Sequence, residues 1–475
     1  MTTKRGDTSL ALKAGMWYVI GNVLLRGLAF LTIPIFSRLM SRADFGEFSN
    51  YANWQATLVI ITGAELYNTL NRAYYDYQKN FDQYISSVTF ASIGLTSIFY
   101  LIFLAAGEWI FKIVSIPAEF IHILFITLMF QSCKAIYLAR ERTLYRYKSV
   151  MVISAISFLI PTLVSVLLVI LLDDSLKLAA RIYGFFGPIS LVGFFCALVM
   201  INRGKVFRLD HCKYSFKLSI PLLFHNLSAY LLISTNITIT KNIVGADHTS
   251  VISIAMSTVQ ILTILFQALT NALITWLMDN LEQKNYDKIR KNTLVFIMVL
   301  FLISLAVIIL APEIVWILGG AKYNDAVNLV PGFVVAVFLQ TLVSLFTIVL
   351  TYDKNVVLTA IATCSVTVGN IFAKVFLLRS YGVKILIYIN IVSYMILFIL
   401  NYIFVRKAGY KCIVNIKMII LISLSLLVAS ILILYFYKHS VVRYLMIFVA
   451  LCVLSYFVWK KRKKIIILFR SVKNA

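Results

Sequence analysis

Four charged residues lie within stretches of the chain that are otherwise apolar: Arg26, Glu65, Lys134 and Lys374. A charged side chain in the middle of a bilayer costs about 2.5–3.5 kcal/mol even on a lenient insertion scale, so four facing lipid would cost on the order of 10 kcal/mol. They must therefore face a hydrated cavity or one another. Three cations against one acid favour an anionic molecule in such a cavity.

The sequence leaves two roles open for these charges. Arg26 and Glu65 could form a structural ion pair inside a helix bundle, or one of them could contact a transported molecule or take part in coupling. Lys134 and Lys374 lie nearer the ends of their stretches, and a long aliphatic stem lets an ammonium group reach the membrane interface. Asn370 lies one helical turn before Lys374 on the same side, so this pair could instead line a cavity.

Further polar residues occur along the apolar stretches. His225, Asn226 and Asn236 share one stretch, where such side chains commonly link transmembrane helices for about 1 kcal/mol each. Contact with sugar hydroxyls is the alternative for them. Arg38 and Lys241 lie at the exterior ends of their stretches, where solvation at the surface is the simpler role.

These residues belong to a chain with the composition of a membrane protein. Of its 475 residues, 61% are hydrophobic and only 13% are charged, against about 25% charged in soluble domains. Because about 20 apolar residues span a bilayer as a helix, long apolar runs predict the spans. Fourteen such runs occur, at 14–38, 50–70, 84–107, 120–138, 150–172, 178–200, 217–240, 249–277, 293–311, 328–350, 356–378, 382–405, 416–437 and 441–459. Their continuity excludes a transmembrane barrel, whose strands alternate, and predicts an all-α polytopic membrane protein.

The net charge of +25 is distributed by side of the membrane. With fourteen spans and a cytoplasmic N-terminus, the connecting segments on the cytoplasmic side hold the whole excess of Lys and Arg over acids, as the positive-inside rule requires. This charge orients the protein and does not indicate a nucleic-acid partner. The basic tail 460–475 is expected to lie on anionic membrane lipids. Six cysteines and five histidines are dispersed without metal-ligand spacing, so no metal site is predicted.

A basic segment after the sixth predicted span divides the first twelve helices into two sets of six. The predicted organisation is an N-terminal six-helix bundle at 1–201, a basic cytoplasmic linker at 202–217, a C-terminal six-helix bundle at 218–405, and two extra helices with a basic cytoplasmic tail at 406–475.

The first helix of each set closes with a similar stretch. RLMSRADFGEFSNYANW at 38–54 and KNIVGADHTSVISIAMS at 241–257 both run from a cation through turn residues to Ala-Asp and an apolar segment. Parallel six-helix repeats are typical of transporters that bind their substrate between the halves. We therefore expect two six-helix bundles in a pseudo-twofold arrangement.

The stretch LMSRADFGEF, from Leu39 to Phe48, resembles the corner after the first helix in the polysaccharide transport family. These Wzx-type O-antigen flippases belong to the multidrug/oligosaccharidyl-lipid/polysaccharide flippase superfamily. Further similar segments follow in family order: GAELYNTLNRAYYDY, LEQKNYDKIRK, PEIVWILGGAKYNDAVNLVP and LLRSYG. The positions that match the family are Gly46, Gly63, Arg72, Gly320, Tyr323, Pro331 and Gly382.

The chain departs from the family pattern at two places. Asn236 stands where the family often has an acid in its seventh helix, and Ser250-Val251-Ile252 replaces the usual Gly-x-Tyr at the start of the eighth. The resemblance therefore does not carry an acid-based coupling step over to this chain.

The resemblance implies a flippase that moves undecaprenyl-diphosphate-linked oligosaccharide units, of O-antigen or a related polysaccharide, from the inner to the outer leaflet. The route would be alternating access through a cationic central cavity. The implied location is the bacterial cytoplasmic (inner) membrane, with both termini cytoplasmic. Association with a polysaccharide polymerase and a chain-length regulator stays open. No enzymatic activity and no cofactor are implied, and a coupling H⁺ or Na⁺ is left undecided.

Two other functions stay open. A multidrug exporter of the same superfamily would bind cations and require acids in its cavity, against the balance of three cations to one acid. A membrane polysaccharide polymerase or glycosyltransferase would need a large catalytic loop. The pair Asp173-Asp174, however, lies in a gap of a few residues.

Overall fold

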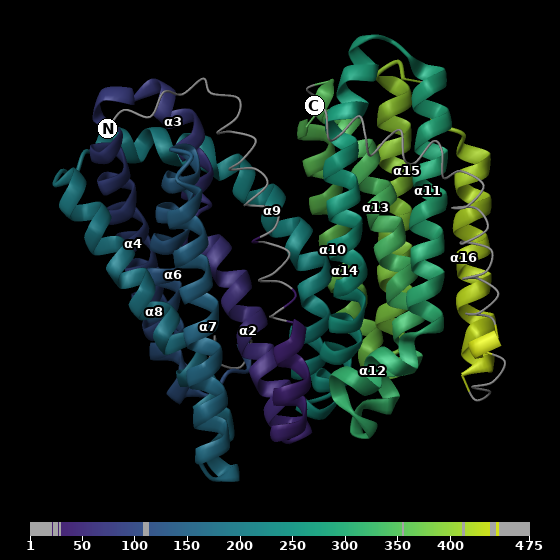
Figure 1. Cartoon of the computed structure of the whole chain (residues 1–475), viewed down its shortest axis with the longest axis horizontal. Coiled ribbons are helices and arrows are strands. Elements are labelled where there is room, and N and C mark those ends of the chain that lie inside the picture. The colour runs from purple at the N-terminus through teal and green to yellow at the C-terminus, as the bar shows by residue number, and fades with distance from the viewer. Residues whose placement is uncertain are drawn as a thin grey trace.

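The computed structural model describes residues 21, 27, 30–107, 114–353, 356–410, 414–437 and 443–445. They form helices joined by short turns (Figure 1). The α-helices are α2 (Arg42–Thr62), α3 (Leu70–Asp76), α4 (Phe81–Ala106), α6 (Ile121–Thr143), α7 (Tyr147–Leu171), α8 (Lys177–Gly204), α9 (Leu209–Ile243), α10 (Ala246–Glu282), α11 (Tyr286–Ile309), α12 (Ala311–Gly319), α13 (Val330–Tyr352), α14 (Val356–Tyr381), α15 (Ile385–Lys407) and α16 (Ile416–Phe436). A helical segment Phe30–Leu39 precedes α2, and the 3₁₀ helices include η1 (Leu66–Thr69) and η5 (Ala321–Asn328).

Eleven helices in the described part of the chain are long and apolar enough to cross a membrane. They correspond to the eleven consecutive predicted runs from 84–107 to 416–437. The prediction of an all-α polytopic membrane protein is therefore confirmed. The run 441–459 and much of the run 14–38 lie outside the described residues.

The predicted span 50–70 is wrong in its limits, because the helix there is α2, from Arg42 to Thr62. The Ser41 hydroxyl caps its start by accepting a hydrogen bond from the Asp44 amide at 3.0 Å, a common way to satisfy the first free N–H groups. The helix ends at Gly63 because Ala64 and Glu65 have φ angles of 45° and 54°, a left-handed conformation that a helix cannot continue through.

Two sets of helices stand side by side in Figure 1. Helices α4, α6, α7 and α8 pack together in the first set, and α10, α11, α13, α14, α15 and α16 in the second, with α2 between the sets. The long helix α9 contacts α4 and η1 near its start and packs against α14 and α10 further along. Only residues 205–208 of the predicted linker 202–217 lie between α8 and α9. We call the two ends of the molecule the α3 end and the α12 end.

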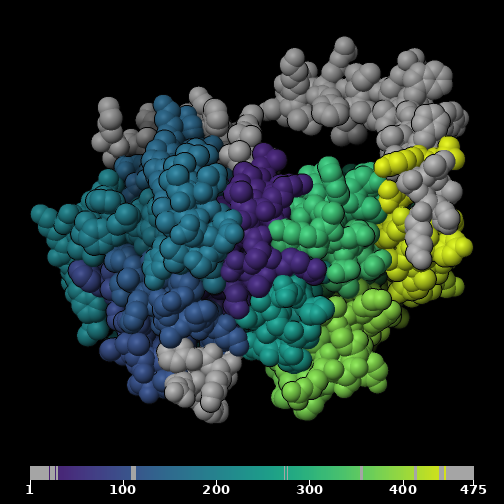
Figure 2. Space-filling model, turned by 90° about the horizontal axis from the view of Figure 1, so that it is seen from below, coloured from purple at the N-terminus to yellow at the C-terminus, as the bar shows by residue number. Residues whose placement is uncertain are grey.

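The two similar stretches noted in the sequence contact each other at the α12 end. A Cβ atom on Gly46 of α2 would lie 2.0 Å from the carbonyl oxygen of Ala246 on α10, so only glycine allows this approach. Beside it, Glu47 pairs with Lys241. Figure 2 shows the α12 end, with the purple segment of the chain lying between the blue first set and the green second set. The contact between α2 and α10 therefore joins the two sets at this end.

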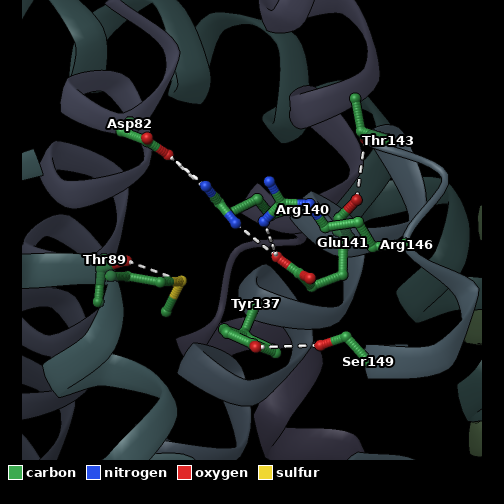
Figure 3. Close-up of polar contacts among 10 residues, drawn as sticks. Asp82, Thr89, Tyr137, Arg140, Glu141, Thr143, Arg146 and Ser149 are labelled. Carbon is green, nitrogen blue, oxygen red and sulfur yellow. Dashed lines mark hydrogen bonds and ion pairs between the residues drawn. The ribbon is translucent and has the colours of Figure 1, made fainter. Parts of the chain in front are cut away.

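An ion-pair cluster connects three helices of the first set at the α3 end (Figure 3). Arg140 on α6 donates through Nε and Nη2 to Asp82 Oδ1 of α4, at 3.0 and 2.7 Å. Its Nη1 donates to Glu141 Oε1 at 2.5 Å, and Arg146, just before α7, lies 3.8 Å from the same oxygen. Because the Arg140 and Glu141 side chains are 5% and 3% exposed, neither charge can exchange its partner for water.

Replacing Arg140 with methionine should lower the free energy of unfolding by about 3 kcal/mol, because a buried ion pair that loses one partner leaves an uncompensated charge. Replacing the half-exposed Arg146 with methionine is the matched control, with an expected loss below about 1 kcal/mol. Denaturation in mixed micelles measures both values. Equal stability of the two variants would contradict the structural role of Arg140.

Candidate functional site

A central cavity of about 570 Å³ lies between the two helix sets, nearer the α12 end. The segment Phe30–Leu39, α2 and α8 form one wall, and α9, α10, α13 and α15 form the other. Its polar lining residues are Thr32, Ser49, Asn53, Arg181, Tyr230, Ser234, Asn236, Ser253, Ser257, Gln260, Thr263, Gln340, Asn390 and Tyr394. Arg181 is the one charged residue among the described lining.

Arg181, near the start of α8, is only 6% exposed. Its guanidinium carbon lies 3.4 Å from the ring centroid of Phe36 and 4.3 Å from that of Phe48, and Nη1 donates to Ser165 Oγ at 2.9 Å. No carboxylate of the described residues pairs with it, and its Nε has no hydrogen-bond partner there. A buried guanidinium with a free donor is suited to binding a carboxylate or phosphate.

Sequence reasoning missed Arg181. The residue lies inside the predicted run 178–200, close to its exterior end, and is not among the candidates that the sequence predicts. In the structure α8 begins at Lys177, so Arg181 is in the second turn of the helix and faces inward. The signal available in the sequence was an arginine inside an apolar run.

A second cavity of about 550 Å³ lies nearer the α3 end, between α2, η1, α6 and α9. Three of its lining residues are charged: Glu65, Lys134 and Arg142. Tyr230 lines both this cavity and the central one, so the two spaces adjoin. The structure therefore brings the predicted residues Glu65, Lys134 and Asn226 together and adds Arg142.

Glu65 is held by three hydrogen bonds to one carboxylate oxygen. Its Oε2 accepts from Tyr67 Oη at 3.1 Å, Asn68 Nδ2 at 2.5 Å and Asn226 Nδ2 at 3.0 Å. The sequence predicted that Glu65 lies along a transmembrane helix. In the structure it lies in the break between α2 and η1. Arg26, its predicted partner, lies outside the described residues, so the Arg26–Glu65 pair stays a prediction.

A third cavity of about 400 Å³ lies within the second helix set, between α9, α10, α13, α14 and α15. It contains His225 and no Lys, Arg, Asp or Glu among its described lining residues. Thr263, Val337, Gln340 and Tyr394 line both this cavity and the central one.

Lys374 is fully buried between α14 and α9. Its Nζ donates to the Leu232 carbonyl at 3.0 Å and to Thr235 Oγ1 at 2.9 Å, so the ammonium group does not reach the membrane interface. Lys374 and Asn370 are not among the lining residues of the three cavities described here. The predicted cargo role of this pair stays a prediction, and the contacts give Lys374 a role in joining two helices.

A chain of amides connects three helices beside the central cavity. Asn370 Nδ2 donates to Ser393 Oγ at 2.8 Å, and Asn390 Nδ2 donates to Asn236 Oδ1 at 3.0 Å. Asn236 thus links helices, as expected for an intramembrane asparagine, and also lines the central cavity. Both roles left open by the sequence are compatible with this position.

The cations at the α12 end have partners within the protein. Arg38 Nη1 donates to Ile317 O at 2.9 Å and thereby caps the end of α12, whereas Lys241 pairs with Glu47. Lys322 Nζ donates to Met40 O at 2.7 Å. Burial, followed by the charges of Arg38, Arg42 and Lys177, lowers the pKa of Lys322. Arg38 and Lys241 therefore have protein partners in addition to solvent.

Four other family positions have separate structural roles. Arg72 is exposed and pairs with Asp76 at 3.1 Å. Gly320 and Gly382 have φ angles of 73° and 67°, a backbone conformation that favours glycine. Tyr323 is fully buried, and its ring lies 6.0 Å from that of Phe45. None of the four lines a cavity described above.

The fold and the cavities define a polytopic helical membrane protein with polar spaces between two helix sets, an architecture shared with solved transporters. "Lipid II flippase MurJ, inward closed conformation" matches with a TM-score of 0.72 and 15% identity, over 95% of this chain and 100% of that chain. An inward-facing multidrug resistance MATE family transporter matches with a TM-score of 0.54 and 13% identity, over 84% and 96%. A MOP superfamily transporter from Pyrococcus furiosus matches with a TM-score of 0.52 and 14% identity, over 86% and 99%. These likenesses show the fold.

Residues 11–251 match the model of the polysaccharide biosynthesis protein family, and the chain belongs to that family. The family predicted from the sequence is therefore confirmed. No curated protein matches the chain significantly.

Proposed function

We propose that the protein is a flippase for undecaprenyl-diphosphate-linked oligosaccharide units, of O-antigen or a related surface polysaccharide. The observation that carries this proposal is the pair of adjoining cavities. Among their described lining residues, Lys134, Arg142 and Arg181 stand against the one acid Glu65. A polar passage with an excess of cations suits a lipid whose head is a diphosphate with sugars attached. The apolar tail can stay in the bilayer while the head crosses.

The charge distribution of the sequence orients this passage. The α3 end would be cytoplasmic by the positive-inside rule, with both termini on that side of the bacterial inner membrane. Lys134 and Arg142 would then receive the diphosphate, and Arg181 would hold it nearer the α12 end. Two negative charges leaving a negative interior gain about 2.3 kcal/mol each per 100 mV, so the membrane potential favours export with or without a coupling ion.

Alternating access requires the α12 end to open. The close contact of Gly46 with Ala246 and the Glu47–Lys241 pair hold α2 against α10 there. We propose that the six-helix bundles at 1–201 and 218–405 rock apart at this contact, with residues 202–217 connecting them. A polysaccharide polymerase and a chain-length regulator would act on the exported cargo.

The alternative of a multidrug exporter differs from the proposal in the charge of its cargo. Proteoliposomes that contain the full chain and fluorescent undecaprenyl-diphosphate oligosaccharide test both functions. We expect the oligosaccharide to become accessible to an external glycosidase faster than in protein-free vesicles, and we expect no uptake of the cation ethidium. Oligosaccharide movement equal to that in protein-free vesicles would contradict the proposal, and ethidium transport would favour the exporter.

A further inference from the structure

The third cavity has walls rich in hydroxyl and amide groups, and we call it the hydroxyl cavity. Its polar lining residues are His225, Thr263, Gln267, Thr270, Asn271, Gln340, Thr341, Ser344, Thr347, Thr363 and Tyr394. His225 is the one titratable side chain among them besides Tyr394, and the described lining contains no Lys, Arg, Asp or Glu. An ionic group would find no counter-charge there, whereas an uncharged polar group would find many hydrogen-bond partners.

The hydroxyls of this cavity are arranged to accept hydrogen bonds. Thr341, Ser344 and Thr347 on α13 each donate to a carbonyl of their own helix, at 2.9, 2.7 and 3.1 Å, and Thr363 on α14 does so at 2.8 Å. A hydroxyl that has donated its hydrogen still has lone pairs to accept another. Asparagine and glutamine amides add both donors and acceptors, so the wall can match the hydroxyl groups of a sugar.

Three lining residues carry a buried polar atom without a hydrogen-bond partner among the described residues: His225 Nδ1, Thr270 Oγ1 and Tyr394 Oη. A buried polar group left unpaired costs about 1–3 kcal/mol, and such groups are few in native proteins. Once these side chains turn toward the cavity, an occupant with many hydroxyls can supply the missing partners, whereas a hydrocarbon occupant cannot.

The hydroxyl cavity is also placed to receive part of a larger molecule. It shares Gln340 and Tyr394, among other residues, with the central cavity, where Arg181 lies. We propose that the hydroxyl cavity binds uncharged sugar residues of a cargo whose diphosphate lies at Arg181. This inference rests on the proposed function for the diphosphate, and assigns the sugars to helices α10, α13 and α14.

The test uses a triple variant of residues that line the hydroxyl cavity and not the central one: Asn271→Leu, Ser344→Ala and Thr347→Val. The matched control is Ser423→Ala with Ser425→Ala on α16, whose hydroxyls also donate to their own helix and line none of the three cavities. The full chain in nanodiscs is titrated with three ligands: undecaprenyl diphosphate, the undecaprenyl-diphosphate-linked oligosaccharide purified from the cells that make the protein, and the free oligosaccharide released from that lipid by mild acid.

We expect the triple variant to bind both sugar-bearing ligands at least about tenfold more weakly, since three hydrogen bonds of about 0.5–1.5 kcal/mol are lost. Its affinity for undecaprenyl diphosphate should be unchanged, and the α16 control should match the wild type throughout. The inference would be overturned if the triple variant bound the free oligosaccharide as tightly as the wild type does. It would also be overturned if the wild type did not bind the free oligosaccharide. An equal loss of affinity for undecaprenyl diphosphate would overturn it as well. If the wild type binds the free oligosaccharide but not undecaprenyl diphosphate, the proposed diphosphate function fails while the sugar site stands.

Discussion

Replacing Arg181 with glutamine is expected to weaken binding of undecaprenyl diphosphate by about 30- to 150-fold and to reduce flipping accordingly. The guanidinium is buried and lacks a carboxylate partner among the described residues, its Nε has no hydrogen-bond partner there, and the residue lines the central cavity. A charge-assisted hydrogen bond contributes about 1.5–3 kcal/mol, and the upper part of that range corresponds to this change in Kd. Equilibrium binding to the full chain in nanodiscs measures the effect.

Two further variants separate the charge of Arg181 from its packing. Arg181→Lys keeps the cation but loses the planar fork, so an intermediate affinity is expected. Ser165→Ala removes the hydroxyl that accepts from Nη1 and keeps the cation, so it should bind nearly as well as the wild type. A folded Arg181→Gln protein with wild-type affinity would show that Arg181 does not bind the cargo.

Replacing Gly46 with alanine is expected to open the α12 end and to reduce flipping at least about fivefold. The added Cβ would lie 2.0 Å from the Ala246 carbonyl oxygen, and both atoms belong to helices with no flexible side chain to move aside. Overpacking of this kind costs about 1–3 kcal/mol, which shifts the equilibrium constant between the states closed and open at this end by about 5- to 150-fold toward the open state. The protein would then complete its transport cycle less often.

The measurement is the distance between nitroxide labels on Ala43→Cys and His248→Cys, two exposed positions on either side of the contact, in a chain without its native cysteines. Gly94→Ala on α4 is the matched control, since no heavy atom lies within 4 Å of its added Cβ. We expect longer distances for Gly46→Ala and an unchanged distribution for Gly94→Ala. Identical distributions for both variants would show that this contact does not close the α12 end.

Much of the fold could be predicted from the chain alone, because an apolar run of membrane length has only one stable form in lipid. The runs from 84–107 to 416–437 all became helices of the expected type. The failure at α2 has a physical cause. Its first two turns carry the charges of Arg42, Asp44 and Glu47, whereas the segment after its end contains the buried apolar residues Leu66 and Leu70. Hydrophobicity therefore placed the span too far along the chain.

The candidate site could be predicted only as a set of residue types. Glu65, Lys134 and Asn226 were selected because polar groups in an apolar run need partners, and all three line the second cavity. Lys374 was selected by the same rule, but its partners are a carbonyl and a hydroxyl of α9. Whether a buried polar group faces a cavity or a neighbouring helix depends on tertiary packing, which spacing along one helix does not determine.

The role of Arg181 and the existence of the hydroxyl cavity could not be predicted from the sequence, because both depend on tertiary packing. Arg181 is surrounded by Phe36 from one segment, Phe48 from α2 and Phe185 from its own helix. Taken one at a time, the threonines and the serine of α13 look like ordinary helix residues, because each hydroxyl donates to a backbone carbonyl of the same helix. Only the packing of five helices gathers them around one space.

The most direct test of the central claim is electron cryomicroscopy of the full chain in nanodiscs with undecaprenyl-diphosphate oligosaccharide. We predict density for the diphosphate between the helix sets, within hydrogen-bonding distance of Arg181 in one state or of Lys134 and Arg142 in another. Head-group density confined to the outer surface of the helices, with the cavities between the sets unchanged from the ligand-free protein, would contradict the account.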